Sequence, residues 1–312
     1  MDRNDRTITA FTMVGHAMFH TYELVIPIFI VIWLDAFSTT TAFLGVVVGL
    51  SYAFTGIGAL PSGILADRVS SKRLIVLCLI GMGTSFAVVS AAPNLPVLTV
   101  GLLAWGAAAS IYHPVALSLI SRGAKEQGTA FAYHGAAGNV GVAIGPLLAA
   151  ILLAFFGWRV VAAILVVPIV IALLAVTRME FDETAGSEAR GSGRASDGSG
   201  EIRNFGEFLE NTKLLFVGGF VFVFVIGILY GLYYRGALTF LPDLLADVPI
   251  FAPIDINGRS FEPSQYVFAG LLLLGGLGQF TGGKLADRIQ PEKALVSVYT
   301  VLLLLALVFI PS

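Results

Sequence analysis

The hexapeptides GILADR at residues 63–68 and GKLADR at residues 283–288 decide the fold of this chain. Each follows a long apolar run and leads, past further basic residues, into another apolar run. A charged turn repeated between apolar helices is typical of membrane proteins built from duplicated helical bundles. Such an arrangement suits a carrier in which one bundle rocks against the other. The repeat therefore predicts membrane-spanning helices in two related halves.

The composition excludes an ordinary soluble domain. The chain is 57% hydrophobic and only 12% charged, with a mean hydropathy of +0.88, whereas soluble chains carry about 25% charged residues. A single cysteine, Cys78, excludes an internal disulfide and a cysteine-rich metal site. We expect no cleavable signal peptide, because the first apolar stretch is too long for a signal core. The bilayer is the expected environment, and no nucleic-acid partner is indicated.

The predicted fold is an all-α, polytopic helical bundle. A spanning helix needs about 20 mostly apolar residues, and nine stretches qualify: residues 9–34, 41–66, 73–92, 95–121, 128–156, 158–178, 213–243, 264–288 and 292–311. Residues 1–178 are thus an expected six-helix N-terminal bundle, and residues 213–312 a partial C-terminal bundle of three helices. The glycine-, serine- and charge-rich residues 179–212 are expected to form a flexible cytoplasmic linker.

The basic residues indicate the orientation of the bundle. Almost all lysines and arginines fall on one side of this layout, and only Arg159, Arg235 and Arg259 fall near the other side. Because cytoplasmic loops of membrane proteins are enriched in lysine and arginine, the amino terminus is expected in the cytoplasm. The chain is thus predicted to be a multi-pass protein of the plasma membrane.

These motifs resemble the major facilitator superfamily of twelve-helix secondary transporters. Residues 63–68 resemble that family's loop signature between helices 2 and 3, and residues 283–288 resemble its degenerate copy between helices 8 and 9. The segments IYHP, GTAF, GNVGVAIGPLLAA and YRGALTFLP resemble the fosmidomycin-resistance branch of drug exporters; they occupy residues 111–114, 128–131, 138–150 and 234–242.

The chain departs from that branch at two points. The branch carries an Asn-Asp pair after the helix-1 histidine, whereas here His20 is followed by Thr21, Tyr22 and Glu23. Three further helices of the family would follow Ser312, so the chain is expected to be truncated after helix 9.

The resemblance implies a conformational latch at each charged turn. The first copy comprises Gly63, Asp67, Arg68 and Arg73, and the second comprises Gly283, Asp287 and Arg288. A glycine lets a partner helix come close, and Asp67 can accept hydrogen bonds from a neighbouring helix or loop. The alternative is a turn that merely carries positive charge.

A second motif lies in the fifth predicted helix. Gly138, Gly141, Gly145 and Pro146 combine small residues three and four apart, which admit another helix, with a proline that bends its own helix. The resemblance implies that this pattern marks exporters that exchange substrate for protons. Generic close packing is the alternative.

The first predicted helix carries the candidate proton-coupling residues. His16, His20 and Glu23 are spaced four and three apart, which places them within about 60° on one helical face. A carboxylate inside the membrane is costly and normally faces an interior cavity. Low-dielectric surroundings favour the neutral form of each group, so all three are candidate proton carriers. A polar contact between helices is the alternative. Without a cysteine or a second nearby acid, no metal site and no cofactor are predicted.

Polar residues of later helices are candidates for a substrate cavity: Tyr112, His113, His134, Asn139, Tyr234 and Arg235. Arg235 admits two positions. It either extends to the outer boundary or points inward, where it would pair with an anion or a carboxylate.

The favoured function is a proton-coupled exporter of small polar or amphipathic compounds that works by alternating access. The alternatives are an uptake symporter for a small organic anion, with Arg235 as its partner, and a truncated membrane protein that does not transport. An enzyme is not expected, because no catalytic carboxylate cluster, nucleophile–base pair or metal motif is present, and no phosphate-binding loop pattern occurs. The oligomeric state is left open.

Overall fold

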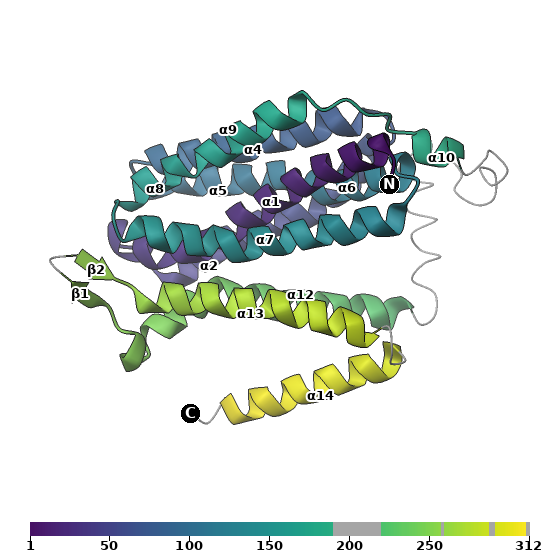
Figure 1. Ribbon diagram of the computed structural model, residues 1–312. Coiled ribbons are helices and arrows are strands. Elements are labelled where there is room, and N and C mark those ends of the chain that lie inside the picture. The colour runs from purple at the N-terminus through teal and green to yellow at the C-terminus, as the bar shows by residue number, and fades with distance from the viewer. Residues whose placement is uncertain (190–219, 257–258, 287–290, 310–312) are drawn as a thin grey trace. The chain divides into compact units, whose positions relative to one another are not determined.

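The computed structural model describes residues 1–189, 220–256, 259–286 and 291–309 (Figure 1). The chain divides into two compact units, Met1–Ala269 and Gly270–Ser312. The first unit contains all of the contacts discussed below.

The six spans predicted for the first half are all helical. Three are single helices, and three are interrupted near the middle by a short turn at Gly58, at Ser110 to Ile111, and at Leu165. In chain order the helices are α1 (Arg3–Ala36), α2 (Thr41–Ile57), α3 (Ala59–Ala66), α4 (Ser71–Ala91), α5 (Leu95–Ala109), α6 (Tyr112–Gly123), α7 (Gln127–Leu153), α8 (Trp158–Ile164) and α9 (Val166–Thr177).

The remainder of the chain contains the last three predicted spans and a small hairpin. The elements are α10 (Ala185–Ala189), α12 (Phe220–Ala246), the 3₁₀ turn η2 (Pro249–Phe251), β1 (Ile254–Ile256), β2 (Arg259–Phe261), α13 (Pro263–Ala286) and α14 (Pro291–Phe309). β1 and β2 pair antiparallel, with Asp255 opposite Ser260, and this hairpin was not predicted from the sequence. Residues 190–212 of the predicted linker lie outside the described residues.

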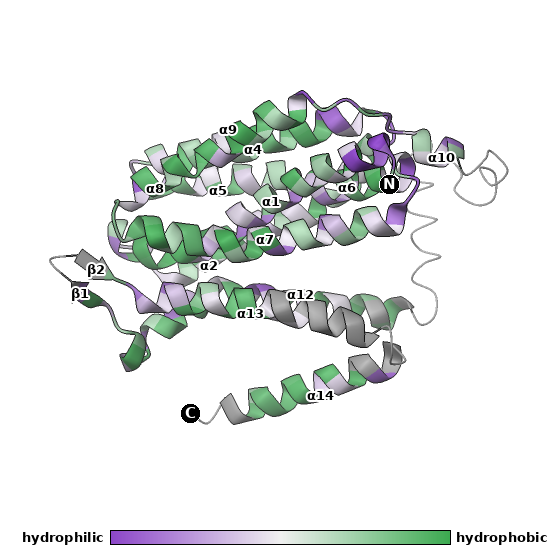
Figure 2. Cartoon of the chain, viewed as in Figure 1, coloured by the Kyte–Doolittle hydropathy of each residue, from purple (hydrophilic) through white to green (hydrophobic). Residues whose placement is uncertain are grey.

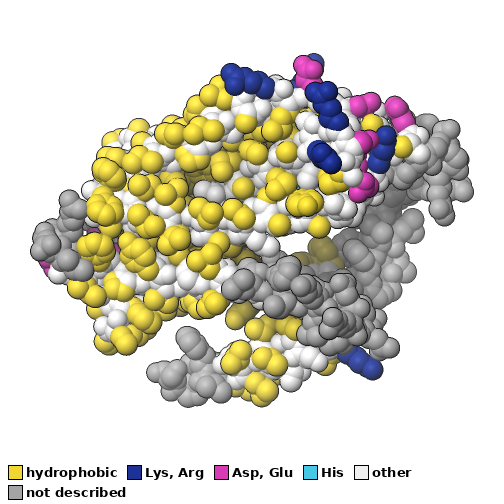
Figure 3. All heavy atoms as spheres, in the orientation of Figure 1, with side chains coloured by type: hydrophobic (Ala, Val, Ile, Leu, Met, Phe, Trp, Pro, Cys, Tyr) yellow, Lys and Arg dark blue, Asp and Glu magenta, His cyan; other side chains and the backbone are white. Residues whose placement is uncertain are grey.

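Length and composition make this a membrane bundle. Within the described ranges, seven helices are long and apolar enough to cross a bilayer, and Figure 2 shows hydrophobic residues along most of their length. Lysine, arginine and acidic side chains gather mainly at the end where the N-terminus and α10 lie (Figure 3), here called the basic end. The all-α, polytopic fold predicted from the sequence is confirmed.

Short polar side chains begin several of these helices. Asp2, Thr40, Ser70 and Asn94 each precede a helix and accept a hydrogen bond from the backbone amide three residues later. These caps satisfy amides that have no carbonyl partner inside the helix. The helix boundaries therefore follow from local sequence signals.

α1 is the central helix of the first unit. It is apolar on nearly all sides and is the most buried of the membrane-length helices, as expected for a helix packed on several faces. Its contacts include α7, α6, α9, α4 and α12. Groups on α1 are therefore shielded from lipid and face the interior.

The glycines of the fifth predicted span bring α7 against the backbone of α1. A Cβ atom on Gly138 would lie 2.5 Å from the His16 ring, and one on Gly145 would lie 2.8 Å from Thr21. One on Gly141 would overlap the carbonyl oxygen of Ala17. Small residues at such crossings allow helices to meet closely. The glycines, three and four residues apart, thus allow α7 to pack directly against α1, the helix that carries the polar residues.

Candidate functional site

The three candidate proton carriers of α1 form a continuous chain of close polar contacts. Glu23 is only 2% exposed, and its Oε2 lies 2.7 Å from His20 Nδ1. His20 Nε2 lies 3.0 Å from His16 Nε2, and His16 Nδ1 donates to the backbone carbonyl of His134 at 2.7 Å. This path starts near the middle of α1 and runs towards the basic end.

The donor and acceptor roles of these groups determine how many hydrogens the three contacts require. A carbonyl oxygen only accepts, so His16 Nδ1 carries a hydrogen. One hydrogen must lie between His16 and His20, and another between His20 and Glu23, for both remaining contacts to be hydrogen bonds. Two neutral histidines and a carboxylate supply one hydrogen too few. All three contacts can therefore be hydrogen bonds at the same time only if one further hydrogen is present.

Arg235 of α12 meets the other oxygen of the same carboxylate. Its Nη1 lies 2.5 Å from Glu23 Oε1, so the two side chains form an ion pair. The guanidinium lies over the Tyr52 ring, with its Cζ 4.9 Å from the ring centroid, and the Tyr52 hydroxyl donates to the Glu23 carbonyl at 3.2 Å. Of the two positions considered for Arg235, the structure has the inner one.

A cavity lies beside this ion pair, between α2 and α12. Its volume is about 840 Å³, and its polar lining residues include Tyr52, Arg235 and Thr239. Phe240 and several glycines complete a mostly apolar wall. Such a wall with a few polar groups is typical of small-molecule sites.

The other candidate cavity residues divide into two groups. His113 and His134 approach His16: the His134 ring stacks on it at 3.9 Å between centroids, and the His113 ring meets it edge-on at 5.1 Å. Tyr112 is fully buried, and its hydroxyl donates to the Thr12 carbonyl.

Tyr234 and Asn139 lie apart from the histidines' ring contacts. Tyr234 stacks on Tyr230 with 5.8 Å between ring centroids, and Asn139 is half-buried. The structure thus gathers the histidines, but not every residue of the predicted cavity, around α1.

The first charged turn pairs with a residue that the sequence did not single out. Arg122, at the end of α6, lies 3.5 Å from Asp67 and donates to the Ala66 carbonyl at 2.8 Å and to the Ser71 hydroxyl at 3.1 Å. Asp67 itself is 73% exposed. The position of Arg122 in the last turn of an apolar span, on the same side as residues 63–68, was the available signal.

Other latch residues show fewer contacts. A Cβ atom on Gly63 would lie 4.0 Å from Pro114, an ordinary separation, so the close helix contact expected there is not seen within the described residues. Arg68 and Arg73 are exposed. Gly283 lies within α13, but its surroundings are not described. Asp287 and Arg288 lie outside the described residues.

The first residues of the predicted linker contact the basic end. Glu183 accepts hydrogen bonds from the Ser70 hydroxyl at 2.6 Å and from the amides of Ser71 and Lys72 at 2.8 and 3.1 Å. Burial raises the pKa of Glu183, but these hydrogen bonds lower it by more, so its pKa lies below the ordinary value of 4.5. A carboxylate also suits the positive end of α4.

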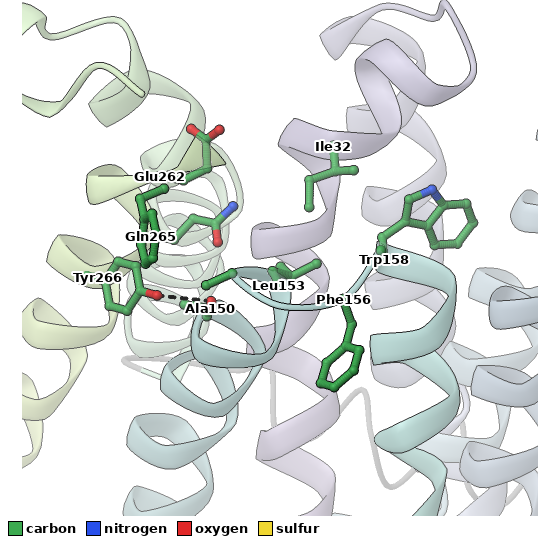
Figure 4. A pocket seen from close by; sticks show the side chains of 11 residues that line it. Ile32, Ala150, Leu153, Phe156, Trp158, Glu262, Gln265 and Tyr266 are labelled. Carbon is green, nitrogen blue, oxygen red and sulfur yellow. Dashed lines mark hydrogen bonds between the residues drawn. The ribbon is translucent and has the colours of Figure 1, made fainter. Parts of the chain in front are cut away.

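A smaller pocket lies at the opposite end of the first unit (Figure 4). Its volume is about 260 Å³, and Trp158, Phe156, Gln265 and Tyr266 contribute to its wall. The Tyr266 hydroxyl donates to the Ala150 carbonyl at 3.2 Å, which ties the start of α13 to α7. Sequence reasoning missed this contact because it overlooked the β1–β2 hairpin that leads into α13.

Comparison with known proteins gives the same curated relative from two bacterial strains, together with several solved structures. The methyl viologen resistance protein SmvA of Salmonella typhimurium is 36% identical over 132 residues, which cover 41% of this chain and 26% of SmvA. The match therefore spans about a quarter of that relative.

The solved structures share the fold at low sequence identity. A bacterial homolog of the human lysosomal transporter Spinster, in an inward-facing and unoccupied conformation, superposes with a TM-score of 0.72 at 17% identity. The alignment covers 94% of this chain and 64% of that one. A D-xylose–proton symporter gives a TM-score of 0.60 at 14% identity, covering 91% of this chain and 69% of the symporter.

The family model of the Major Facilitator Superfamily matches residues 9–312, nearly the whole sequence. With the transporter folds above, this match confirms the resemblance and indicates a transporter rather than an enzyme. The chain belongs to the Major Facilitator Superfamily.

Proposed function

We propose that this chain is a secondary transporter that couples proton movement to the export of small polar or amphipathic compounds by alternating access. The observation that carries the proposal is the ion pair between Glu23 of α1 and Arg235 of α12, with His20 on the second carboxylate oxygen. The division into residues 1–178, 179–212 and 213–312 is part of the proposal. The ion pair would then join the two halves.

The Glu23 carboxylate can be neutralised either by Arg235 or by a proton. The competition between Arg235 and the proton is the proposed coupling. A buried carboxylate is stable when it is paired with a cation or when it is protonated. Protonation of Glu23 removes its charge and releases Arg235, so the contact between the halves weakens. Loss of the proton restores the pair. His20 and His16 would carry the proton between Glu23 and the basic end.

The cavity beside Arg235 supports a compound with an apolar body. Its wall is mostly apolar with a few polar side chains, which suits an amphipathic molecule of moderate size. The similarity to a protein named for methyl viologen resistance supports export as the direction. Residence in the plasma membrane with the basic end in the cytoplasm completes the proposal.

Arg235 also favours a second candidate, uptake of a small organic anion together with a proton. Protonation of Glu23 would release the guanidinium, which could then bind a carboxylate or a phosphate through two parallel hydrogen bonds (bidentate binding). In that case proton and anion would enter together. In the export reaction the substrate would leave as the proton enters.

Transport by the purified protein in liposomes, under an imposed pH gradient, tests the proposal. Methyl viologen and a simple carboxylate such as benzoate serve as probes. Exchange of methyl viologen against protons, lost in Glu23→Gln, is the expected result. Asp35→Asn, which changes an exposed acid on the same helix, is the matched control.

Two results would contradict export. Transport driven by the pH gradient that is unchanged in Glu23→Gln would remove the coupling role of this residue. Accumulation of benzoate with protons, abolished by Arg235→Ala, would support the symporter instead.

A further inference from the structure

Three histidines from three helices converge in the interior of the first unit. His16 of α1, His113 of α6 and His134 of α7 each offer a ring nitrogen, and these nitrogens all lie within 4.8 Å of one another. We propose that they form a binding site for a divalent first-row transition metal ion, with Zn²⁺ the best match. This site does not depend on the direction or coupling of transport.

His134 provides an independent indication of a missing ligand. It is only 3% exposed, and neither Nδ1 nor Nε2 has a hydrogen-bond partner among the described residues. Leaving a buried polar group without a partner destabilises a fold. A metal ion bound to one ring nitrogen would satisfy that nitrogen's lone pair.

The orientation of His16 is that of a metal-binding histidine. Its Nδ1 donates to the backbone carbonyl of His134, so the lone pair of the neutral ring is on Nε2. Metal-bound histidines commonly donate their other nitrogen to a carbonyl or carboxylate in this way. Here one proposed ligand is held by the backbone of another.

The donor set selects the kind of metal. Neutral imidazoles suit Zn²⁺, Cu²⁺, Ni²⁺ and Co²⁺, whereas Mg²⁺ and Ca²⁺ prefer oxygen donors. Three histidines leave one position of a tetrahedral ion open for water or another ligand. Sequence spacing gave no sign of this set, because His113 and His134 lie about a hundred residues from His16 and meet it only through the fold.

Binding requires a small rearrangement of side chains. Zn–N bonds of about 2.0–2.1 Å place tetrahedral ligand atoms about 3.3 Å apart, so the ring nitrogens must draw together and the stacked rings of His16 and His134 must tilt apart. His16 Nε2 would exchange its contact with His20 for the metal. Occupancy would thus separate His16 from the His20–Glu23 pair.

Titration of the purified, tag-free protein in detergent with Co²⁺ tests the site. Co²⁺ reports tetrahedral nitrogen coordination through its visible absorption, and Zn²⁺ should displace it. One ion per chain is expected. His113→Ala and His134→Gln should each weaken binding by about 100-fold or more, beyond the loss typical of supporting residues. His20→Gln changes the remaining histidine and removes the contact that the metal must displace at His16, so it should not weaken binding.

X-ray absorption of the Zn²⁺-loaded, unsubstituted protein gives a second measurement that does not depend on the variants folding. Three imidazole ligands with Zn–N distances of about 2.0–2.1 Å are expected. The proposal is overturned if the unsubstituted protein shows no saturable binding of Co²⁺ or Zn²⁺. It is also overturned if a folded His113→Ala/His134→Gln double variant keeps the original affinity, or if the bound ion has oxygen ligands only.

Discussion

Glu23 and Arg235 form an ion pair in which the two partners differ in exposure. The carboxylate is 2% exposed and the arginine side chain 36% exposed, and 2.5 Å separates Oε1 from Nη1. Arginine can therefore reach water if its partner is lost, whereas the carboxylate cannot. Substitution of Glu23 and substitution of Arg235 should therefore change the stability of the protein by different amounts.

Arg235→Met should destabilise the protein more than Glu23→Gln does. The first change leaves a buried acid without its cation, at a cost of up to about 3 kcal/mol, and the second leaves a partly solvated cation, at a cost of about 1 kcal/mol. Combining both should cost less than the sum. Thermal unfolding in detergent measures each value, and strict additivity would show that the pair is not coupled.

Gly141→Ala should destabilise the contact between α1 and α7. The added methyl group would overlap the Ala17 carbonyl, and overpacking of this kind costs about 1–3 kcal/mol. Gly135→Ala is the matched control in the same helix, because nothing lies within 4 Å of its Cβ position; alanine should be neutral or favourable there. Equal melting temperatures for the two variants would contradict the close contact.

Asp67→Asn should slow transport without weakening the fold. The Asp67–Arg122 pair is exposed, and such pairs contribute only about 0–1 kcal/mol, so a change in turnover would indicate a role in conformational exchange. Asp2→Asn removes another exposed ion pair at the basic end, with Lys125, and should leave the rate unchanged. Substrate affinity and turnover are measured together. Equal loss of both in Asp67→Asn would argue against a latch.

Glu183→Ala should free the segment that begins the predicted linker. Hydrogen exchange at the Ser71 and Lys72 amides should lose protection, whereas Glu183→Gln, which keeps an acceptor oxygen, should retain part of it. The pKa of Glu183 is lowered in the folded protein, so its contribution is complete above the ordinary pKa and is lost as the pH falls through the lowered value. Protection that is independent of pH in this acidic range would contradict this assignment.

The helices could be predicted from the sequence because long apolar runs leave few alternatives. Polar caps such as Asn94 and Ser70 also set their starts within a few residues. The hairpin at Ile254–Ile256 and Arg259–Phe261 could not be predicted in this way, because three-residue strands give too short a pattern.

The candidate site was only partly accessible to sequence reasoning. Helical spacing placed His16, His20 and Glu23 together, because four and three residues return to one face. The depth of Arg235 depended on where α12 lies against α1, which helix length alone does not fix. His134 joins His16 through a contact 118 residues apart, and no local pattern contains that information.

The absence of side chains between α7 and α1 at Gly141 and Gly145 has a mechanical consequence. Backbones in direct contact cannot slide past one another without separating, so these two helices should travel as one stiff lever. Deformation during a transport cycle would then concentrate where α1 meets α12, at a junction held by ionic attraction. Relaxation-dispersion NMR should detect slow internal motion where α1 meets α12, and no such motion where α1 meets α7.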